Sequence, residues 1–200
     1  MKNDSALGIF FRVPEYGKVK KRLAIQIGKE KALELYALML HTTLGNVSCL
    51  KKVDIYGFYL GSELLKDSSP ERVIYLPQQG NDLGERMING IRLLFKKDYK
   101  KVVLIGADSP DLPIIYIEDA FLKLDLYDLV IGPSEDGGYY LIGMNRPLDA
   151  IFKNIKWGSR SVLKDTISIT EKEKIKYFLL DEWYDIDDIK GLKKWRNHKF

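Results

Sequence analysis

The chain has 200 residues, of which 46% are hydrophobic and 12% aromatic, and its formal net charge at pH 7 is +4. This length and composition are those of a globular protein with a sizeable core, and we expect residues 1–200 to form a single domain. One cysteine, Cys49, excludes an internal disulfide, and two histidines disfavour histidine-based zinc sites and Ser-His-acid catalysis.

Short apolar runs alternate with amphipathic stretches along the chain. This alternation is typical of repeated strand and helix units that build a mostly parallel sheet. In chain order, strands are predicted at residues 6–11, 53–60, 73–76, 102–105, 129–132, 139–144 and 177–180. The strand at 139–144 follows a short connection, so we expect it to be antiparallel to its neighbours.

Apolar residues at helical spacing predict helices between these strands. They are expected at residues 20–44, divided at Gly28, and at 82–95, 113–124 and 187–195, with one more that is capped by Ser159 and runs toward Ile169. The predicted fold is a three-layer α/β/α sandwich whose mostly parallel sheet includes an antiparallel strand.

The most informative segment is 102–111, in which an unbroken apolar run ends at Gly106 and is followed by Asp108. A run that is apolar on every side indicates a strand buried on both faces, and ligands bind beyond the carboxyl ends of such strands. Asp108 is therefore a candidate ligand for a hard cation such as Mg2+ carrying a polyphosphate. The alternative is that Asp108 only caps a turn, because Asp before Ser-Pro is common in turns.

The loop after the first predicted strand runs from Arg12 through Gly17 to Leu23 and concentrates basic residues at the start of a helix. Unpaired N–H groups at a helix N-terminus attract anions, and Lys or Arg side chains in the same turn reinforce a phosphate site. The loop is not a Walker motif, because Val19 stands where that motif requires Ser or Thr. A solvated basic helix face is the alternative.

Two further glycine-containing segments lie next to predicted strands. Residues 136–140, Asp-Gly-Gly-Tyr-Tyr, would let a ligand approach the main chain, although Asp-Gly is also a strong hairpin signal. Residues 78–87 enter a helix with Asp82 near the cap position, whereas Arg86 could reach a ligand or a carboxylate.

Asp185 and Asp187 stand at alternate positions after the last predicted strand. Two such acids can share one side of an extended segment and meet one cation, although acids before a helix are also common caps. All of these segments follow strand ends, and we expect them to meet at one edge of the sheet.

The order of these motifs resembles the GT-A-type family of small microbial proteins assigned as glycosyltransferases. These are relatives of the nucleotidyltransferases that make molybdenum-cofactor and deazaflavin-cofactor dinucleotides. The resemblance covers nearly the whole chain, and the matching positions are Pro14, Gly17, Lys20, Arg22, Leu23, 82–87, Gly106, Asp108, Pro110, Leu112, 136–139, Ile155 and Trp157. It implies the fold of the nucleotide-diphospho-sugar transferases.

The resemblance also implies roles for individual residues. Mg2+ or Mn2+ would bind Asp108, with Asp185 or Asp187 as a second ligand. Lys20 and Arg22 would neutralise a diphosphate.

The remaining candidates would contact the substrates. Asp136 is the catalytic candidate, and it would face the sugar or the acceptor. The other candidate substrate-binding residues are Arg12, Gly17, Asp82, Arg86, Gly137, Gly138 and Tyr139.

The leading interpretation is a metal-dependent transferase that binds a nucleotide diphospho-sugar and passes the sugar to an unknown acceptor. A nucleotidyltransferase that uses a nucleoside triphosphate and a phosphorylated acceptor, with release of pyrophosphate, is the alternative. A non-catalytic nucleotide-binding protein is the third reading. It is motivated by Lys21 in place of the family's Thr and by Gly191 in place of the last acid of its final motif.

The basic segment 190–199 could contact nucleic acid or solvate a terminal helix, and we favour solvation because it carries no recognisable nucleic-acid-reading motif. The longest apolar runs reach about six or seven residues, far below the ~20 of a membrane helix. The first residues also lack a signal core. We therefore expect a cytoplasmic protein with no nucleic-acid partner and no membrane insertion.

Overall fold

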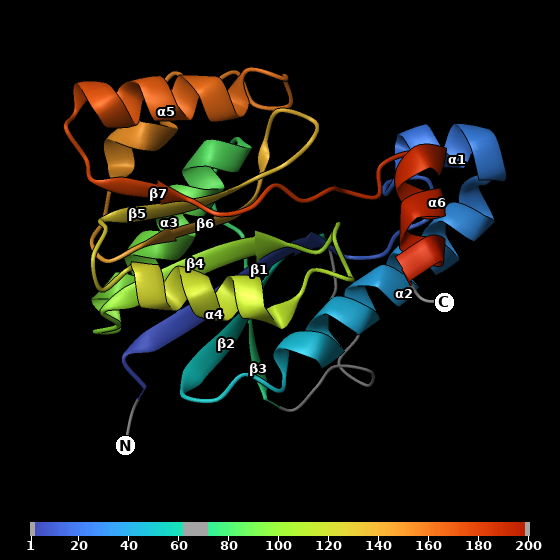
Figure 1. Ribbon diagram of the computed structural model, residues 1–200. Coiled ribbons are helices and arrows are strands. Elements are labelled where there is room, and N and C mark those ends of the chain that lie inside the picture. Colours follow the sequence, from blue (N-terminus) through green and yellow to red (C-terminus); the bar gives the residue numbers. More distant parts are fainter. Residues whose placement is uncertain (1–2, 62–71, 199–200) are drawn as a thin grey trace.

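The structure is a computed structural model that describes residues 3–61 and 72–198; Lys199 of the basic C-terminal segment lies outside them. The strands of the described residues form one sheet in the order β3-β2-β1-β4-β6-β5-β7 (Figure 1). Their bounds are β1 Ser5–Arg12, β2 Val53–Leu60, β3 Val73–Pro77, β4 Lys101–Gly106, β5 Leu129–Pro133, β6 Tyr139–Met144 and β7 Tyr177–Leu179.

Strand β6 runs antiparallel to β4 and β5, whereas β1 pairs in parallel with β2 and β4, β2 with β3, and β5 with β7. The predicted fold class is thereby confirmed, including the antiparallel strand. The chain turns back at 134–138 after β5, too short a connection for the crossover that a parallel neighbour needs.

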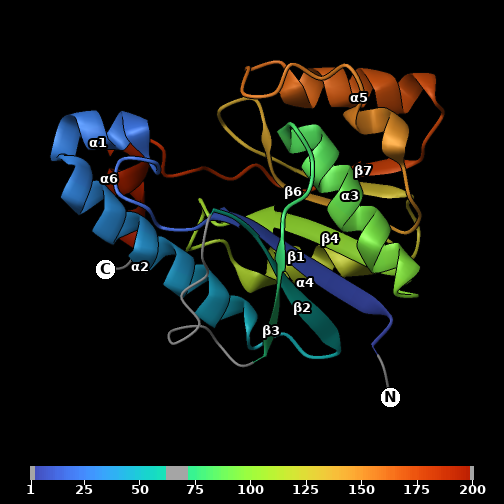
Figure 2. The same ribbon diagram turned by 180° about the vertical axis from the view of Figure 1, so that it is seen from behind.

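Helices cover both faces of the sheet. Their bounds are α1 Lys21–Ile27, α2 Lys29–Val47, α3 Leu83–Lys96, α4 Ile114–Lys123, η2 Asp149–Phe152, α5 Val162–Lys172 and α6 Ile189–His198. The buried residues of α2 and α4 pack on one face, and those of α3 and η2 pack on the other. Figure 2 shows α3 in front of the sheet, on the face turned away from the viewer in Figure 1, and partly buried residues of α5 pack on the same core cluster as α3.

Strand β1 shows why the sheet needs both layers. Leu7, Ile9 and Phe11 belong to the core under α2 and α4, whereas Ala6 and Phe10 pack toward α3. Successive side chains of a strand point to opposite faces, so an apolar run without alternation must be covered on both sides.

A third cluster lies at one end of the sheet, where α1, the first half of α2 and α6 come together (Figure 1). Leu23 of α1, Met39 of α2 and Trp195 of α6 are buried there with Ile186. Gly28 separates α1 from α2 at φ 89°, a backbone conformation that favours glycine, and this confirms the predicted division of the first helical stretch.

The prediction for the start of α5 was wrong. Ser161, not Ser159, occupies the N-cap position, and the helix begins at Val162. The Ser159 hydroxyl instead pairs with the Ser161 hydroxyl at 2.9 Å, within the loop that follows Gly158. The short helix Asp149–Phe152 was not predicted, because one turn carries too little periodicity to detect. No helix in the described ranges has the length and apolarity to cross a bilayer.

Candidate functional site

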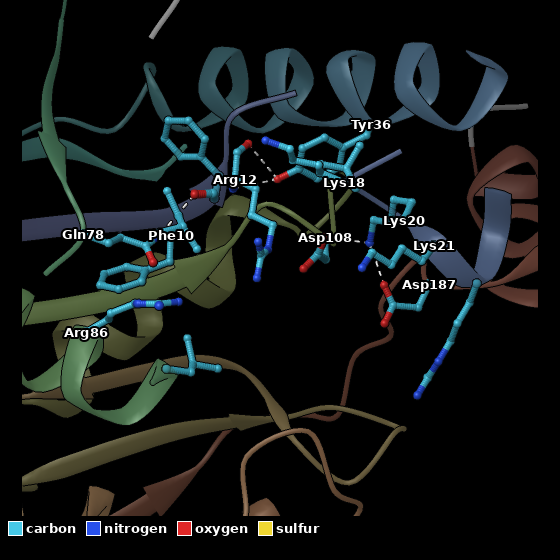
Figure 3. Close-up of a pocket in the computed structure, with 15 residues that line it drawn as sticks. Phe10, Arg12, Lys18, Lys20, Lys21, Tyr36, Gln78, Arg86, Asp108 and Asp187 are labelled. Carbon is cyan, nitrogen blue, oxygen red and sulfur yellow. Dashed lines mark hydrogen bonds and ion pairs between the residues drawn. The ribbon is translucent and has the colours of Figure 1, made fainter. Parts of the chain in front are cut away.

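An ion-pair cluster lies beyond the carboxyl ends of β1 and β4. Lys20 Nζ lies 2.6 Å from Asp108 Oδ1 and 2.7 Å from Asp187 Oδ1 (Figure 3). The Lys20 side chain is only 4% exposed, whereas those of Asp108 and Asp187 are 48% and 52% exposed. Residues from distant parts of the chain thus place one buried ammonium between two accessible carboxylates.

Three elements supply this cluster. Asp108 follows β4, and Lys20 stands at the N-cap position of α1 with φ 44° and ψ 47°. Asp187 lies in the segment between β7 and α6, and the Ile186 N–H donates a 2.9 Å hydrogen bond to the Asp108 carbonyl. That bond fixes the Asp187 segment against the end of β4.

The left-handed backbone of Lys20 is unusual for a residue with a side chain. Lys20 makes no side-chain cap hydrogen bond to α1, although its carbonyl accepts from Ala24 N at 2.8 Å. The strained backbone directs the side chain into the carboxylates instead. Burial lowers the pKa of the Lys20 ammonium, but the charges of Asp108 and Asp187 more than offset this effect and raise it above its ordinary value.

Asp185 lies beside this cluster but makes different contacts. The hydroxyls of Ser109 and Ser134 donate 2.8 Å hydrogen bonds to its two carboxylate oxygens. Burial raises the pKa of Asp185 to about 6, the charge of Asp108 adds to this rise, and the two hydroxyls only partly counter it. Both oxygens of Asp185 are thus engaged by neighbours.

A cavity of about 390 Å³ opens beside Lys20 and is lined by most of the basic residues of the predicted loop (Figure 3). Its basic lining residues are Arg12, Lys18, Lys20, Lys21, Arg22 and Arg86. Asp108 and Asp187 face the same cavity, and Phe10, Phe11 and Leu60 give it apolar wall. The excess of cations suits a polyanionic ligand that also carries an apolar or aromatic part.

Tyr36 of α2 fixes the mouth of this cavity and was not predicted from the sequence. Its hydroxyl accepts a 2.9 Å hydrogen bond from Arg12 N and donates one of 3.1 Å to Arg12 O. Burial is the main reason that the pKa of the Tyr36 hydroxyl is raised. The reciprocal pair holds the main chain where β1 enters the loop.

A second cavity of about 640 Å³ shares Arg22, Leu83 and Asp187 with the first. Asp136, Tyr139 and the other residues of its wall come from several elements. The wall includes Gly138, Trp157, Arg160, Tyr184, Asp185 and Lys190. The two cavities therefore adjoin at Asp187, whose carboxylate pairs with Lys20.

The Asp136-Gly137-Gly138 turn forms one side of the second cavity. Asp136 Oδ1 accepts a 2.9 Å hydrogen bond from Gly138 N, as in an ordinary Asx turn. Gly137 has φ 89°, and a Cβ there would collide with the carbonyl of Arg160. The turn therefore joins β6 as a hairpin and also packs on the loop before α5.

Three predicted site residues line neither cavity, and Gly137, which packs on the Arg160 carbonyl, is one of them. The other two, Asp82 and Gly17, also have structural roles. Asp82 is the N-cap of α3, where its Oδ1 accepts from Glu85 N at 2.9 Å. Gly17 has φ 71°, so it supplies the left-handed position of a turn. Arg86 does line the first cavity while its Nε donates to Gly80 O at 3.0 Å.

The carboxylates beside Lys20 are suited to Mg2+ or Mn2+. Mg2+ is usually held by one or two carboxylates together with waters and substrate phosphates, and Asp108 and Asp187 supply two such carboxylates. Within residues 3–61 and 72–198, no group of three or more His, Cys, Asp or Glu side chains forms a complete metal cage. The donor set therefore fits a metal ion that shares its coordination with a ligand.

A family model described as "Uncharacterized protein conserved in bacteria (DUF2064)" matches residues 49–159, more than half of the chain. The chain is 32% identical to a protein from Desulfovibrio desulfuricans G20 that is provisionally assigned as a nucleotide-diphospho-sugar transferase. That similarity covers 98% of this chain and 88% of the other, with a TM-score of 0.92 for the crystal structure.

A 2-phospho-L-lactate guanylyltransferase from Methanocaldococcus jannaschii is 32% identical over 102 residues, which are 50% of this chain and 44% of that protein. The chain therefore matches less than half the length of this relative. The 4-diphosphocytidyl-2C-methyl-D-erythritol synthase of Anaerococcus prevotii shares the fold at a TM-score of 0.65 and 12% identity, over 98% of this chain and 99% of that one. The two relatives at 32% identity are named as transferases, one of them provisionally, and the two solved structures have the predicted fold.

Proposed function

This chain belongs to the DUF2064 family, and we propose that it is a nucleotide-diphospho-sugar transferase, which is the provisional assignment of its Desulfovibrio relative of known structure. The proposed enzyme uses Mg2+ or Mn2+, binds a nucleotide diphospho-sugar and passes the sugar to an acceptor. The observation that carries the proposal is the ion-pair cluster of Lys20, Asp108 and Asp187, which lines the first cavity and adjoins the second through Asp187.

The first cavity would bind the nucleotide diphosphate. Lys20 and Arg22 would neutralise the phosphates, with Arg12 close by at the end of β1. Asp108 and Asp187 would hold the metal ion. Asp185, whose oxygens accept hydrogen bonds from Ser109 and Ser134, would position the segment that carries Asp187. The bound metal ion supplies Lewis-acid stabilisation of the charge that develops on the leaving diphosphate.

The second cavity would receive the sugar and its acceptor. Asp136 lies on its wall, with one oxygen engaged by Gly138 N. The other oxygen could take the proton of an acceptor hydroxyl, which is the role we propose for Asp136. Trp157 and Tyr139 would provide aromatic surface for a sugar ring.

Nucleotidyl transfer is the second candidate function. It is favoured by the match to a guanylyltransferase, and it needs the same cation and the same basic cavity. The two reactions differ in their products: sugar transfer releases a nucleoside diphosphate, whereas nucleotidyl transfer releases pyrophosphate. GTP and GDP-sugars are therefore the first ligands to compare, followed by the other bases.

The test is a thermal-shift screen with each ligand in Mn2+, Mg2+ or chelator. A ligand at ~100 times its Kd should stabilise the fold by about 2.7 kcal/mol. We expect a metal-dependent shift that Asp108→Asn removes. Asp125→Asn is the matched control, because Asp125 pairs with Lys101 at the opposite end of β4. The absence of any shift would contradict the proposal, and binding without product under every acceptor would indicate a non-catalytic protein.

A further inference from the structure

We infer that Lys20 is a built-in counter-ion that occupies the place of the divalent cation between Asp108 and Asp187, so that metal binds tightly only together with a phosphate ligand that draws Lys20 away. This inference rests on the metal role proposed for the two aspartates. It adds that Lys20 competes with the metal ion for the two carboxylates and that a phosphate ligand must draw Lys20 away before the metal ion binds tightly.

The geometry makes the two cations compete for one position. Lys20 Nζ lies 2.6 Å from Asp108 Oδ1 and 2.7 Å from Asp187 Oδ1. A Mg2+ ion bound to the same two oxygens would lie at about 2.1 Å from each, within the volume that Nζ fills. The ammonium and the metal ion cannot both contact the pair.

Charge strengthens the competition. Two carboxylates and one ammonium give the cluster a net charge of −1, so a divalent cation is attracted less strongly while Lys20 remains than it would be by the two free carboxylates. The ammonium lies between the two carboxylate oxygens, so a metal ion can contact both of them only after the Lys20 side chain has left. The side chain must move, and it must find another anion when it does.

The cavity indicates where that anion comes from. Lys18, Lys21 and Arg22 line the same space, so a diphosphate placed among them would lie within reach of the Lys20 side chain (Figure 3). Phosphate oxygens would replace the carboxylates as partners of Lys20, and the vacated carboxylates could then bind the metal ion that accompanies the phosphates. Metal and nucleotide would thus bind as one unit.

The backbone of Lys20 is consistent with this assignment. A residue at an N-cap ordinarily offers a side-chain oxygen to the helix, and Lys cannot do so. Lys20 instead adopts the left-handed conformation, with φ 44° and ψ 47°, and a side chain that is only 4% exposed. The chain thus keeps a strained residue at a position where its ammonium reaches both carboxylates.

The experiment measures the affinity of Mn2+ alone, without nucleotide, by the loss of the free Mn2+ signal in electron paramagnetic resonance. Wild type is compared with Lys20→Met and with Lys21→Met. Lys21 lines the same cavity and makes no ion pair with either carboxylate, so both variants lose one positive charge. Only Lys20→Met vacates the carboxylate pair.

We expect Lys20→Met to bind Mn2+ roughly 10- to 100-fold more tightly than wild type, as for competition between two coupled ligands. Lys21→Met should stay within about threefold of wild type, because an exposed charge is screened by solvent and salt. The double variant Lys20→Met with Asp187→Asn should bind Mn2+ no more tightly than wild type, because one of the two carboxylates is missing. Equal affinities for wild type and Lys20→Met, or an equal gain in Lys21→Met, would overturn the inference.

A melting curve of each variant checks that it is folded, and Lys20→Gln replaces Lys20→Met if the latter is not. Mn2+ binding to wild type, measured with and without a nucleotide, is an independent test. Tight binding of Mn2+ alone that Asp108→Asn abolishes would contradict the inference, whereas binding that appears only with a nucleotide would support it. The variant titration contains no nucleotide, so its failure would leave the thermal-shift evidence for the proposed function untouched.

Discussion

Gly84, in the first turn of α3, lies directly against the indole of Trp157. A Cβ at Gly84 would be 2.5 Å from Trp157 Nε1 and 2.8 Å from two ring carbons. Trp157 in turn lines the second cavity, where Tyr139 meets its ring edge-on at 6.4 Å between centroids. The absence of a side chain at position 84 therefore sets the position of a wall of the site.

Gly84→Ala should displace the Trp157 indole and destabilise the fold by about 1 to 3 kcal/mol, because overpacked side chains must leave their preferred rotamers. Gly45→Ala is the matched control: Gly45 lies in α2, and a Cβ there meets nothing within 4 Å. That change should stabilise the protein by roughly 0.5 to 1 kcal/mol. Urea unfolding followed by circular dichroism measures both, and a neutral Gly84→Ala would contradict the packing argument.

The hydroxyl of Tyr36 should contribute to the free energy of unfolding through its two hydrogen bonds to the main chain. Tyr36→Phe removes both hydrogen bonds to the main chain of Arg12 and leaves two polar groups without those partners. Unpaired buried groups cost about 1 to 3 kcal/mol, so we expect a loss of that size. Tyr177→Phe is the control, since the Tyr177 hydroxyl makes one exposed hydrogen bond to Glu171. A surface change of this kind should stay within about 0.5 kcal/mol in the same unfolding assay.

Asp185 should make stability fall as the pH rises. Its pKa is about 6 in the folded protein against 3.8 for the free side chain, so between these values the folded state retains a proton that the unfolded state has lost. The contribution is fully present below pH 3.8, decreases through the window and is lost above about pH 6. Asp185→Asn removes this dependence, and Ser109 and Ser134 can still hydrogen bond the amide.

The measurement is the free energy of unfolding of wild type and Asp185→Asn from pH 4 to 8 in chelator. We expect wild type to lose about 2 to 3 kcal/mol relative to the variant between the two ends. Parallel pH profiles for the two proteins would show that Asp185 is not held protonated by its surroundings.

The sequence predicted the layers and the site edge well, for a physical reason. Strands buried on both faces appear as unbroken apolar runs, so the run before Asp108 marked both β4 and its carboxyl end. The ends of β1 and β4 share one edge because the two strands are parallel neighbours. The convergence of the basic loop with Asp108 followed from that topology alone.

Other parts of the site depend on contacts that a sequence does not contain. Nothing in the local pattern around Tyr36 shows that its hydroxyl reaches Arg12, a residue 24 positions away. The same holds for Ser109 and Ser134, which engage Asp185 from two different loops. Pairwise partners of this kind are fixed by the packed fold, whereas strand ends are fixed by local periodicity.

Gly191 stands where the GT-A-type family that the chain resembles has an acid, and the packing of α6 explains the difference. Gly191 is buried at the start of α6, and a Cβ there would lie 2.5 Å from the carbonyl oxygen of Asp185 and 3.0 Å from the Ile186 Cα. These are main-chain atoms, so they cannot move aside as a flexible side chain would. Asp188 caps the helix by accepting hydrogen bonds from Lys190 N and Gly191 N, which leaves no capping role for an acid at 191.

Restoring the family residue with Gly191→Asp should therefore weaken this protein rather than improve it. The added Cβ would push α6 away from the segment that carries Asp187 and cost about 1 to 3 kcal/mol. Gly191→Ala separates the causes, because it adds the same Cβ without a charge and should cost a similar amount. If Gly191→Ala is neutral and only Gly191→Asp is destabilised, the carboxylate charge beside Asp185 is responsible, and the close approach of α6 does not explain the glycine.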